Sequence, residues 1–459
     1  MDATSTDRNR KYALWISALA SFLTPFLGSS LNIALPSLSR EFSLTAVQLT
    51  WIPTAYLLSN VIFLVPFGRV ADIHGRKRIF RIGIWIDVMA CTLATMTPSG
   101  PFFIVLRAFQ GLGGAMIFSA GIAILTAVYP PEQRGRVLGI NVASVYIGLS
   151  LGPVVGGFLT HNFGWRSIFF ANIALGFLII YLVTAKLKGE WAQSAGEKYD
   201  WTGNLLYSAA FVLFMIGFSA MGSLAGYLAL ATAIAMMAVF AVRGLRIEHP
   251  ILDLRLFRIT SFALSNLAAL INYCATYAVG LLLSLFLQTI KSFNPQHTGL
   301  ILLSQPVIMA VLSPYAGRLS DKIEPRIVAS FGMGCTALAL LIFCFLNESS
   351  PLTVVLAALV IGGVGFAFFS SPNTNAVMSS VDKRFLGTAS GLVGTMRLTG
   401  QLLGMGITTL TFRHYLGSQT IEPSVYPSFL LAIRAAFILF TVLCFLGIFA
   451  SLSRGKIRG

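Results

Sequence analysis

The stretch GRVADIHGRKR at residues 68–78 stands between two apolar runs, and a shorter copy of it, GRLSD, recurs at residues 317–321. In each copy an apolar helix is expected to run into a glycine, and an aspartate follows four residues later. A connection of this kind suits a tight turn between two helices on the basic side of a membrane. Its recurrence predicts a chain that is built from two similar halves.

The composition places most of this 459-residue chain in lipid. Hydrophobic residues make up 56% and charged residues only 10%, with a mean hydropathy of +0.80, whereas a soluble domain carries about 25% charged residues. The net charge of +16 is scattered in short clusters between apolar runs, so it does not indicate nucleic-acid binding. The five cysteines fall inside the apolar runs, and no metal-binding spacing occurs. We therefore expect no metal and no cofactor.

Fourteen apolar runs are long enough to cross a bilayer, which requires about 20 mainly apolar residues. With the N-terminus inside, most of the 32 Lys and Arg residues fall in cytoplasmic segments, so both termini are expected in the cytoplasm. The runs cover residues 13–35, 48–68, 79–97, 102–127, 138–160, 167–186, 201–222, 224–243, 261–288, 298–316, 327–346, 352–377, 386–411 and 428–452.

The spacing of the two GRxxD copies predicts the domain organisation. They lie at the inner ends of the second and tenth runs, eight helices apart, whereas a plain repeat of seven helices would place them seven apart. The sequence therefore predicts an N-terminal six-helix bundle (1–188), two inserted helices with a linker (189–245) and a C-terminal six-helix bundle (246–459). The expected fold class is an all-α integral membrane protein.

Five motifs in order resemble signatures of the major facilitator superfamily, specifically its fourteen-helix drug:proton antiporter branch. They are residues 68–78, RAFQGLGG at 107–114, GLSLGPVVGG at 148–157, WRSIFFAN at 165–172 and DWTG at 200–203. The resemblance covers nearly the whole chain. It implies the major facilitator fold and export of small molecules by alternating access in exchange for protons. The expected partners are a small-molecule substrate, protons and the bilayer of the cell membrane, with the chain acting as a monomer.

The resemblance assigns the GRxxD stretches a role as a cytoplasmic gate, and we call residues 68–78 and Gly317–Asp321 the first and second gate segments. Gly68 and Gly75 permit close backbone approach and tight turning. Asp72 is placed to pair with Arg76 or to meet a helix N-terminus. In the alternative interpretation, the basic residues only mark the cytoplasmic side. The second gate segment lacks the GRK tail of the first.

The fifth run carries the antiporter motif of the superfamily. Gly148, Gly152 and Gly156 recur every four residues and share one helix face, a pattern that allows another helix to approach closely. Pro153 removes a backbone hydrogen bond and is expected to bend the helix, next to the further small residue Gly157. The alternative interpretation is tight packing without a transport role.

Proton coupling requires a group that changes its protonation state inside the membrane. Relatives in this branch usually carry an aspartate in the first helix, where this chain has Leu27. In these relatives the arginine that matches Arg107 takes part in proton coupling. One carboxylate, Asp87, falls in the middle of a span, where burial disfavours its charged form. We expect that Asp87 either binds the coupling proton or forms a structural pair with Arg107. Snorkelling of Arg107 to the outer surface is the alternative for that residue.

The remaining site candidates are polar or aromatic residues on helices that are expected to line a cavity. With Arg107 and Arg397 inside the spans, the cavity fits neutral, weakly charged or anionic amphiphiles better than dications. Export of one specific metabolite, uncoupled transport and a non-transporting receptor are the alternatives. The chain contains no ATP-binding or hydrolytic motif, so we expect no enzyme activity. The cavity candidates are Asn32, Tyr56, Gln110, Asn272, Tyr277 and Arg397.

Overall fold

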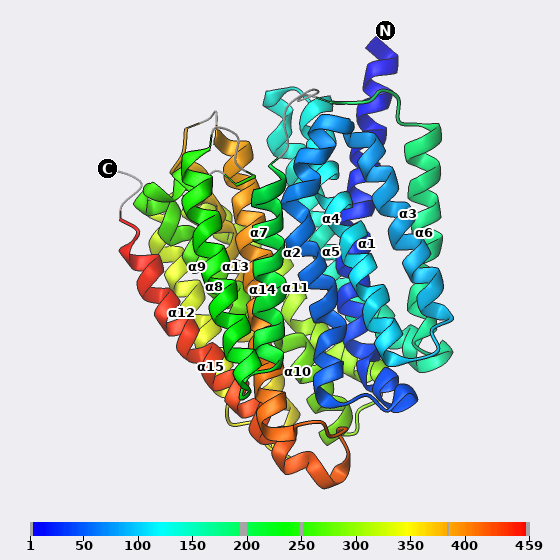
Figure 1. The fold of residues 1–459 in the computed structure, drawn as a ribbon, viewed down its shortest axis with the longest axis vertical. Coiled ribbons are helices and arrows are strands. Elements are labelled where there is room, and N and C mark those ends of the chain that lie inside the picture. Colours follow the sequence, from blue (N-terminus) through cyan, green and yellow to red (C-terminus); the bar gives the residue numbers. More distant parts are fainter. Residues whose placement is uncertain (1–2, 193–199, 248–250, 253, 383–384, 456–459) are drawn as a thin grey trace. The chain divides into compact units, whose positions relative to one another are not determined.

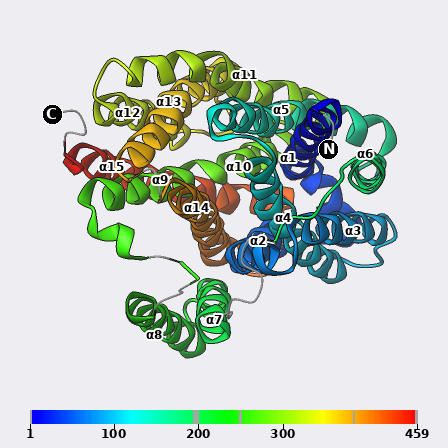
Figure 2. The same cartoon turned by 90° about the horizontal axis from the view of Figure 1, so that it is seen from above.

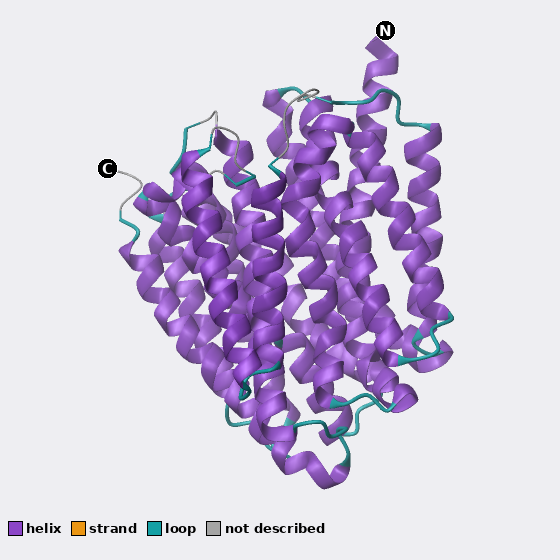
Figure 3. Cartoon of the chain, viewed as in Figure 1, coloured by secondary structure: helices purple, strands orange, loops and turns teal. Residues whose placement is uncertain are grey.

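The computed structural model describes residues 3–192, 200–247, 251–252, 254–382 and 385–455. Within these residues the chain forms helices and turns, and no strand is present (Figure 3). In chain order the helices are α1 (Ala3–Phe42), α2 (Ala46–His74), α3 (Arg76–Thr95), α4 (Gly100–Val128), α5 (Pro131–Phe163), α6 (Arg166–Ala185), α7 (Trp201–Ser219), α8 (Leu224–Arg246), the 3-10 helix η1 (Leu254–Arg258), α9 (Thr260–Tyr277), α10 (Val279–Leu285), the π-helix η2 (Phe286–Ile290), α11 (Pro295–Ser320), α12 (Pro325–Phe343), α13 (Leu352–Ser379), α14 (Leu386–Leu416), the 3-10 helix η4 (Pro423–Val425) and α15 (Tyr426–Ser453) (Figure 1).

The described helices account for the fourteen predicted spans. The elements α9, α10 and η2 follow one another as one apolar span, Thr260–Ile290. Twelve of the spans are long and apolar enough to cross a membrane by length and composition. The other two, α3 and α14, have 20 and 31 residues and carry Asp87 and Arg397, which lower their apolar character. The predicted number of spans and the all-α fold class are therefore confirmed.

The first gate segment differs from the expected loop. Residues 68–74 continue α2 as regular helix, and only Gly75 stands between α2 and α3. Gly75 has a φ of 108°, a conformation that suits glycine and reverses the chain in one residue. The second gate segment likewise lies at the end of α11, which reaches Ser320. The sequence prediction placed the helix ends at the ends of the apolar runs, whereas helices can extend past the hydrocarbon into the headgroup region.

The break between α7 and α8 comprises residues 220–223, between Ser219 and Leu224. Gly222 has a φ of 96°, and the hydroxyl of Ser223 accepts a hydrogen bond from the backbone N–H of Gly226, which caps α8. The two helices lie side by side (Figure 2), and a Cβ atom at Gly217 would come within 2.5 Å of the Leu230 side chain. The inserted pair is thus a close helical hairpin.

The chain divides into two compact units. The first comprises Met1–Phe42, Trp51–Ser208 and Asn294–Gly299, and the second comprises Ser43–Thr50, Ala209–Phe293 and Leu300–Gly459. The predicted division into two bundles and a separate insert stays a prediction.

Each unit contains a close crossing at which glycines of two neighbouring helices face each other. In the first unit α3 and α4 cross at Gly83 and Gly113, where a Cβ atom on either residue would lie 2.9 Å or less from the carbonyl oxygen of the other. In the second unit α12 and α13 cross in the same way at Gly332 and Gly365, with corresponding distances of 2.6 and 2.8 Å. These helices hold the third and fourth places in the two predicted six-helix bundles. The shared crossing supports the two-fold construction that the GRxxD copies predicted.

Candidate functional site

The crossing of α3 with its neighbours determines where Asp87 lies. Helix α3 packs against both α4 and α6 (Figures 1 and 2). At Gly113 the backbone of α4 comes so close that an added Cβ atom would stand 3.1 Å from the backbone nitrogen of Asp87. On the other side, an added Cβ atom at Gly176 of α6 would stand 2.3 Å from the Val88 side chain. Small residues on both neighbours therefore enclose Asp87, which is 2% exposed.

The carboxylate of Asp87 meets polar groups from α6 and from its own helix. The amide nitrogen Nδ2 of Asn172 donates a hydrogen bond of 2.9 Å to Asp87 Oδ2. The same nitrogen lies 3.2 Å from the sulfur of Cys91, one turn further along α3. The Cys91 thiol in turn lies 3.9 Å from Asp87 Oδ2.

The chain of polar contacts continues to Arg107. Gln110 donates from Nε2 to the Cys91 sulfur at 3.1 Å, and its Oε1 accepts a hydrogen bond of 2.5 Å from Nη1 of Arg107. Arg107 is 2% exposed, and its guanidinium lies 4.6 Å from the ring centroid of Tyr56 on α2. Asp87 and Arg107, the two predicted coupling residues, thus belong to one buried network through Gln110 and Cys91. We call Asp87, Cys91, Arg107, Gln110 and Asn172 the α3–α4–α6 cluster.

Tyr56 connects this cluster to α2. Its backbone oxygen would lie 2.2 Å from a Cβ atom at Gly111, and its hydroxyl would lie 2.8 Å from one at Gly114. Glycine at both positions therefore leaves the space that the tyrosine occupies. Asn60, one turn further along α2, donates to the Tyr56 hydroxyl at 3.3 Å.

The first gate segment is held by an ion pair and by contacts to α4. The carboxylate of Asp72 accepts from Nε of Arg76 at 2.7 Å, and Nη1 of Arg76 donates to the carbonyl oxygen of Ala123 at 2.8 Å. Gly68 faces Ser119 at an ordinary contact distance. In the second gate segment Asp321 accepts a hydrogen bond of 3.1 Å from the side-chain amide of Asn375 on α13.

The N-terminus of α3 receives a cap from the segment that follows α6. The two carboxylate oxygens of Glu190 accept hydrogen bonds from the backbone N–H groups of Lys77 and Arg78, at 2.7 and 3.1 Å. The carbonyl oxygen of Trp191 accepts from the backbone N–H of Arg76 at 2.9 Å. A negative charge at this end of a helix is favourable because the free N–H groups and the helix dipole both attract it. The Glu190 carboxylate packs directly against Gly75, where a side chain would collide with it.

The glycines of the antiporter motif face α1. Added Cβ atoms at Gly148, Gly152 and Gly156 would lie within 2.6 Å of Phe22, Ser29 and Ser30 atoms respectively. The hydroxyl of Ser30 donates to the carbonyl oxygen of Gly152 at 2.9 Å. On the neighbouring face of α5, Gly157 and the Pro153 carbonyl contact the first turn of α11, at Pro295 and Gly299. The predicted shared face of three glycines is therefore a close contact between helices.

The other cavity candidates are dispersed. Asn32 lies half-buried on α1, Tyr277 half-buried at the end of α9, and Arg397 half-buried on α14. Asn272 on α9 is fully buried, and neither amide atom of its side chain has a hydrogen-bond partner within the described part of the chain. A buried amide of this kind is costly unless water or a ligand serves it.

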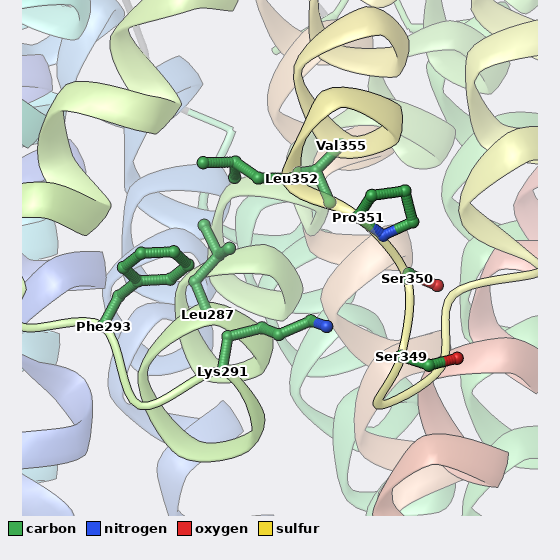
Figure 4. A pocket seen from close by; sticks show the side chains of 8 residues that line it. All are labelled: Leu287, Lys291, Phe293, Ser349, Ser350, Pro351, Leu352 and Val355. Carbon is green, nitrogen blue, oxygen red and sulfur yellow. The ribbon is translucent and has the colours of Figure 1, made fainter.

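A cavity of 290 Å³ opens in the second unit at the ends of η2 and α13 (Figure 4). Its lining combines apolar side chains with Lys291, whose ammonium donates to the backbone oxygen of Glu348. None of the predicted site residues lines this cavity.

Sequence reasoning missed three groups of residues. Asn172 stood in the WRSIFFAN motif without an assigned role, and Cys91 was noted only as one of five cysteines inside the apolar runs. Glu190 was placed in a linker. The available signal for Asn172 was a single amide within the apolar run of α6, whereas contacts between distant segments such as Glu190 and α3 leave no mark in the sequence.

Comparison with known proteins decides the family. The sequence profile of the Major Facilitator Superfamily matches residues 17–247 and 266–456. The chain belongs to this superfamily. It is 30% identical over 423 residues to the multidrug resistance protein Stp of Mycobacterium tuberculosis, a match that covers 91% of this chain and 78% of Stp. It is 28% identical over 435 residues to the riboflavin transporter RibZ of Clostridioides difficile, with 95% of each chain covered.

The fold also matches solved superfamily structures. A bacterial homolog of the human lysosomal transporter Spinster, in an inward-facing and unoccupied conformation, aligns with a TM-score of 0.71 over 97% of each chain at 16% identity. As a member of this superfamily whose sequence relatives are transporters, the chain is a multi-pass membrane transporter and not an enzyme.

Proposed function

We propose that this transporter exports amphipathic small molecules in exchange for protons, and that Asp87 is the group that binds the coupling proton. The observation that carries the proposal is the position of Asp87 in the α3–α4–α6 cluster. A carboxylate that is 2% exposed inside a membrane helix is expensive to keep unless it has a function or a full set of partners.

The cluster offers a route from proton binding to helix movement. When Asp87 takes up a proton it loses its negative charge, and the attraction between Asp87 and the Arg107 cation disappears. Arg107 contacts Gln110 on its own helix and the ring of Tyr56 on α2. The charge change on α3 therefore acts on two helices that carry cavity candidates. This link supports a coupling role over a purely structural pair.

The cargo class is supported by the similarity to Stp, which is named a multidrug resistance protein. Arg107 and Arg397 favour neutral or anionic amphiphiles over dications, and the buried amide of Asn272 offers a donor and an acceptor to a polar group of a substrate. The similarity to RibZ, over nearly the whole chain, favours a second candidate: transport of one specific metabolite with a planar polar ring system, as in riboflavin.

We further propose a location in the cell membrane with both termini in the cytoplasm, and a monomeric transport unit. The distribution of Lys and Arg supports the orientation. With this orientation, both gate segments and Glu190 lie on the cytoplasmic side.

The deciding experiment is transport in proteoliposomes with a panel of amphipathic drugs and riboflavin, with and without an imposed pH gradient. We expect the gradient to drive transport of several panel members by the wild-type protein. Asp87→Asn should lose this response while keeping substrate counterflow. Glu348→Gln, which changes an exposed acid outside the spans, is the matched control and should behave as wild type. A full pH response in Asp87→Asn would exclude Asp87 as the coupling group, and transport of riboflavin alone would favour the single-metabolite alternative.

A further inference from the structure

The side chain of Asn172 has one polar atom, Oδ1, that forms no hydrogen bond with the described residues. It is 0% exposed on α6, and its Nδ2 donates to Asp87 at 2.9 Å. Its Oδ1 is buried and has no hydrogen-bond partner among the residues that the structure describes. Such an unpaired acceptor next to a titratable group is unusual, because buried polar atoms nearly always have a hydrogen-bond partner.

We propose that Asn172 is the positioning residue that serves both protonation states of Asp87, with its amide nitrogen bound to the carboxylate and its amide oxygen bound to the carboxylic acid. This inference rests on the proposed role of Asp87 in proton coupling. A residue on α6 then takes part in proton coupling, both when Asp87 is charged and when it is protonated.

The chemistry of an amide fits this task. A carboxylate can only accept hydrogen bonds, whereas a carboxylic acid has one O–H to donate. When the proton binds to Asp87 Oδ2, the hydrogen bond from Nδ2 of Asn172 loses its charged acceptor. A half-turn about the terminal torsion of Asn172 exchanges Nδ2 and Oδ1, and the new O–H of Asp87 then donates to Oδ1. The half-turn also breaks the contact of Nδ2 with the Cys91 sulfur at 3.2 Å, and Arg107 keeps its charge throughout.

The surroundings of Asp87 leave this role to Asn172. Helix α4 presents the Arg107 cation, α2 presents Tyr56, and α3 itself presents the Cys91 thiol. Arg107 has only donors and cannot accept from a protonated Asp87. The sulfur of Cys91 is a weak acceptor and already receives Nε2 of Gln110. Of these groups, the free oxygen of Asn172 is the strong acceptor next to the acid.

A consequence concerns α6, which would otherwise have no part in coupling. Asn172 lies one turn before Gly176, where an added Cβ atom would stand 2.3 Å from the Val88 side chain of α3. The rotation of the Asn172 amide therefore takes place at the α3–α6 crossing. Protonation of Asp87 thus affects α6 as well as α4.

The test combines Asn172 variants with the pH dependence of transport. Asn172→Leu keeps the branched shape of the side chain and its number of heavy atoms, and it removes both polar atoms. We expect the pH midpoint of gradient-driven transport to rise by about one unit, a roughly tenfold gain in proton affinity, because the charged carboxylate loses a charge-assisted donor that is stronger than the bond to the neutral acid. Asn172→Gln, which retains an amide, should return the midpoint toward wild type. In an Asp87→Asn background, Asn172→Leu should leave the pH profile unchanged.

Infrared difference spectra across a pH titration give a second readout, independent of transport. The carbonyl stretch of the protonated acid should be present in wild type, absent in Asp87→Asn, and moved to higher frequency in Asn172→Leu, because the acid loses its acceptor. Asn172→Ser, with a smaller side chain, can be measured in the same way if the leucine variant does not fold.

The outcomes separate this inference from the proposed function. If Asp87→Asn retains the pH response, the coupling role of Asp87 is wrong. If Asp87→Asn loses the response but Asn172→Leu and Asn172→Ser leave both the midpoint and the carbonyl band in place, the role of Asp87 stands and the inference about Asn172 is overturned.

Discussion

The glycine crossing of α3 and α4 leads to a sharp prediction about Gly113→Ala. A Cβ atom at this position would lie 2.7 Å from the carbonyl oxygen of Gly83 and 3.1 Å from the backbone nitrogen of Asp87. Ordinary contact begins at 3.4 Å, so the two backbones must separate by about 0.7 Å, the difference between 3.4 and 2.7 Å. Both obstructing atoms belong to backbone, which cannot move aside as a flexible side chain would. We expect a loss of about 1–3 kcal/mol in the free energy of unfolding, the usual cost of overpacking.

The matched control is Gly28→Ala, on α1 within another spanning helix. Among the residues that the structure describes, no atom outside its own helix lies within 4 Å of an added Cβ atom at Gly28. Alanine is the better helix former by about 1 kcal/mol, so this variant should be as stable as wild type or slightly more stable.

The assay is thermal unfolding of the purified protein in detergent, followed by intrinsic fluorescence, together with gradient-driven transport in liposomes. Gly113→Ala should lower the midpoint temperature and weaken the pH response, because the separation displaces Asp87 from the cluster. If Gly113→Ala unfolds at the same temperature as Gly28→Ala, the close crossing does not exist in the folded protein and the placement of Asp87 against α4 is wrong.

Three further predictions follow from other contacts. Glu190→Ala removes two hydrogen bonds from the N-terminus of α3 and should lower the free energy of unfolding by about 1 kcal/mol, whereas Glu190→Gln should lose less; thermal unfolding checks both. Arg454 is 2% exposed and donates to Asn373 at 2.8 Å. Arg454→Ala should therefore lower the free energy of unfolding by about 2–4 kcal/mol. An unchanged midpoint of thermal unfolding would contradict the burial of this arginine. In the Glu41–Arg166 ion pair, at 2.6 Å, both side chains are 38% exposed. Glu41→Gln should therefore lower the free energy of unfolding by no more than about 1 kcal/mol, and this loss should shrink in high salt.

The sequence predicts the fold of this protein well because the main signal is length and apolarity. Each spanning helix must satisfy its own backbone hydrogen bonds in lipid, so an apolar run of sufficient length is almost always a helix. The division between α7 and α8 was correctly predicted, and Gly222 and Ser223 supply its turn and its helix cap. The end of α2 was not correctly predicted, because Arg69, Asp72 and His74 interrupt the apolar run while the helix continues to His74.

The site was predictable in part. Asp87 and Arg107 stand out because charges inside apolar runs are rare. Their connection through Cys91 and Gln110 depends on how α3 is rotated and shifted against α4, and sequence periodicity does not determine the register between two helices. The part played by Asn172 depends on the α3–α6 crossing, which the single residue Gly176 sets.

The contact between Glu190 and α3 has a practical consequence for dividing the chain into fragments. The first predicted bundle ends at residue 188, yet Glu190 and Trp191 complete the hydrogen bonding of the Gly75 turn and the first turn of α3. A first half that is produced alone and ends at residue 188 would expose that helix end, whereas one that ends at residue 192 would carry its own cap. Co-expression of two halves to reconstitute the transporter should therefore use the later cut.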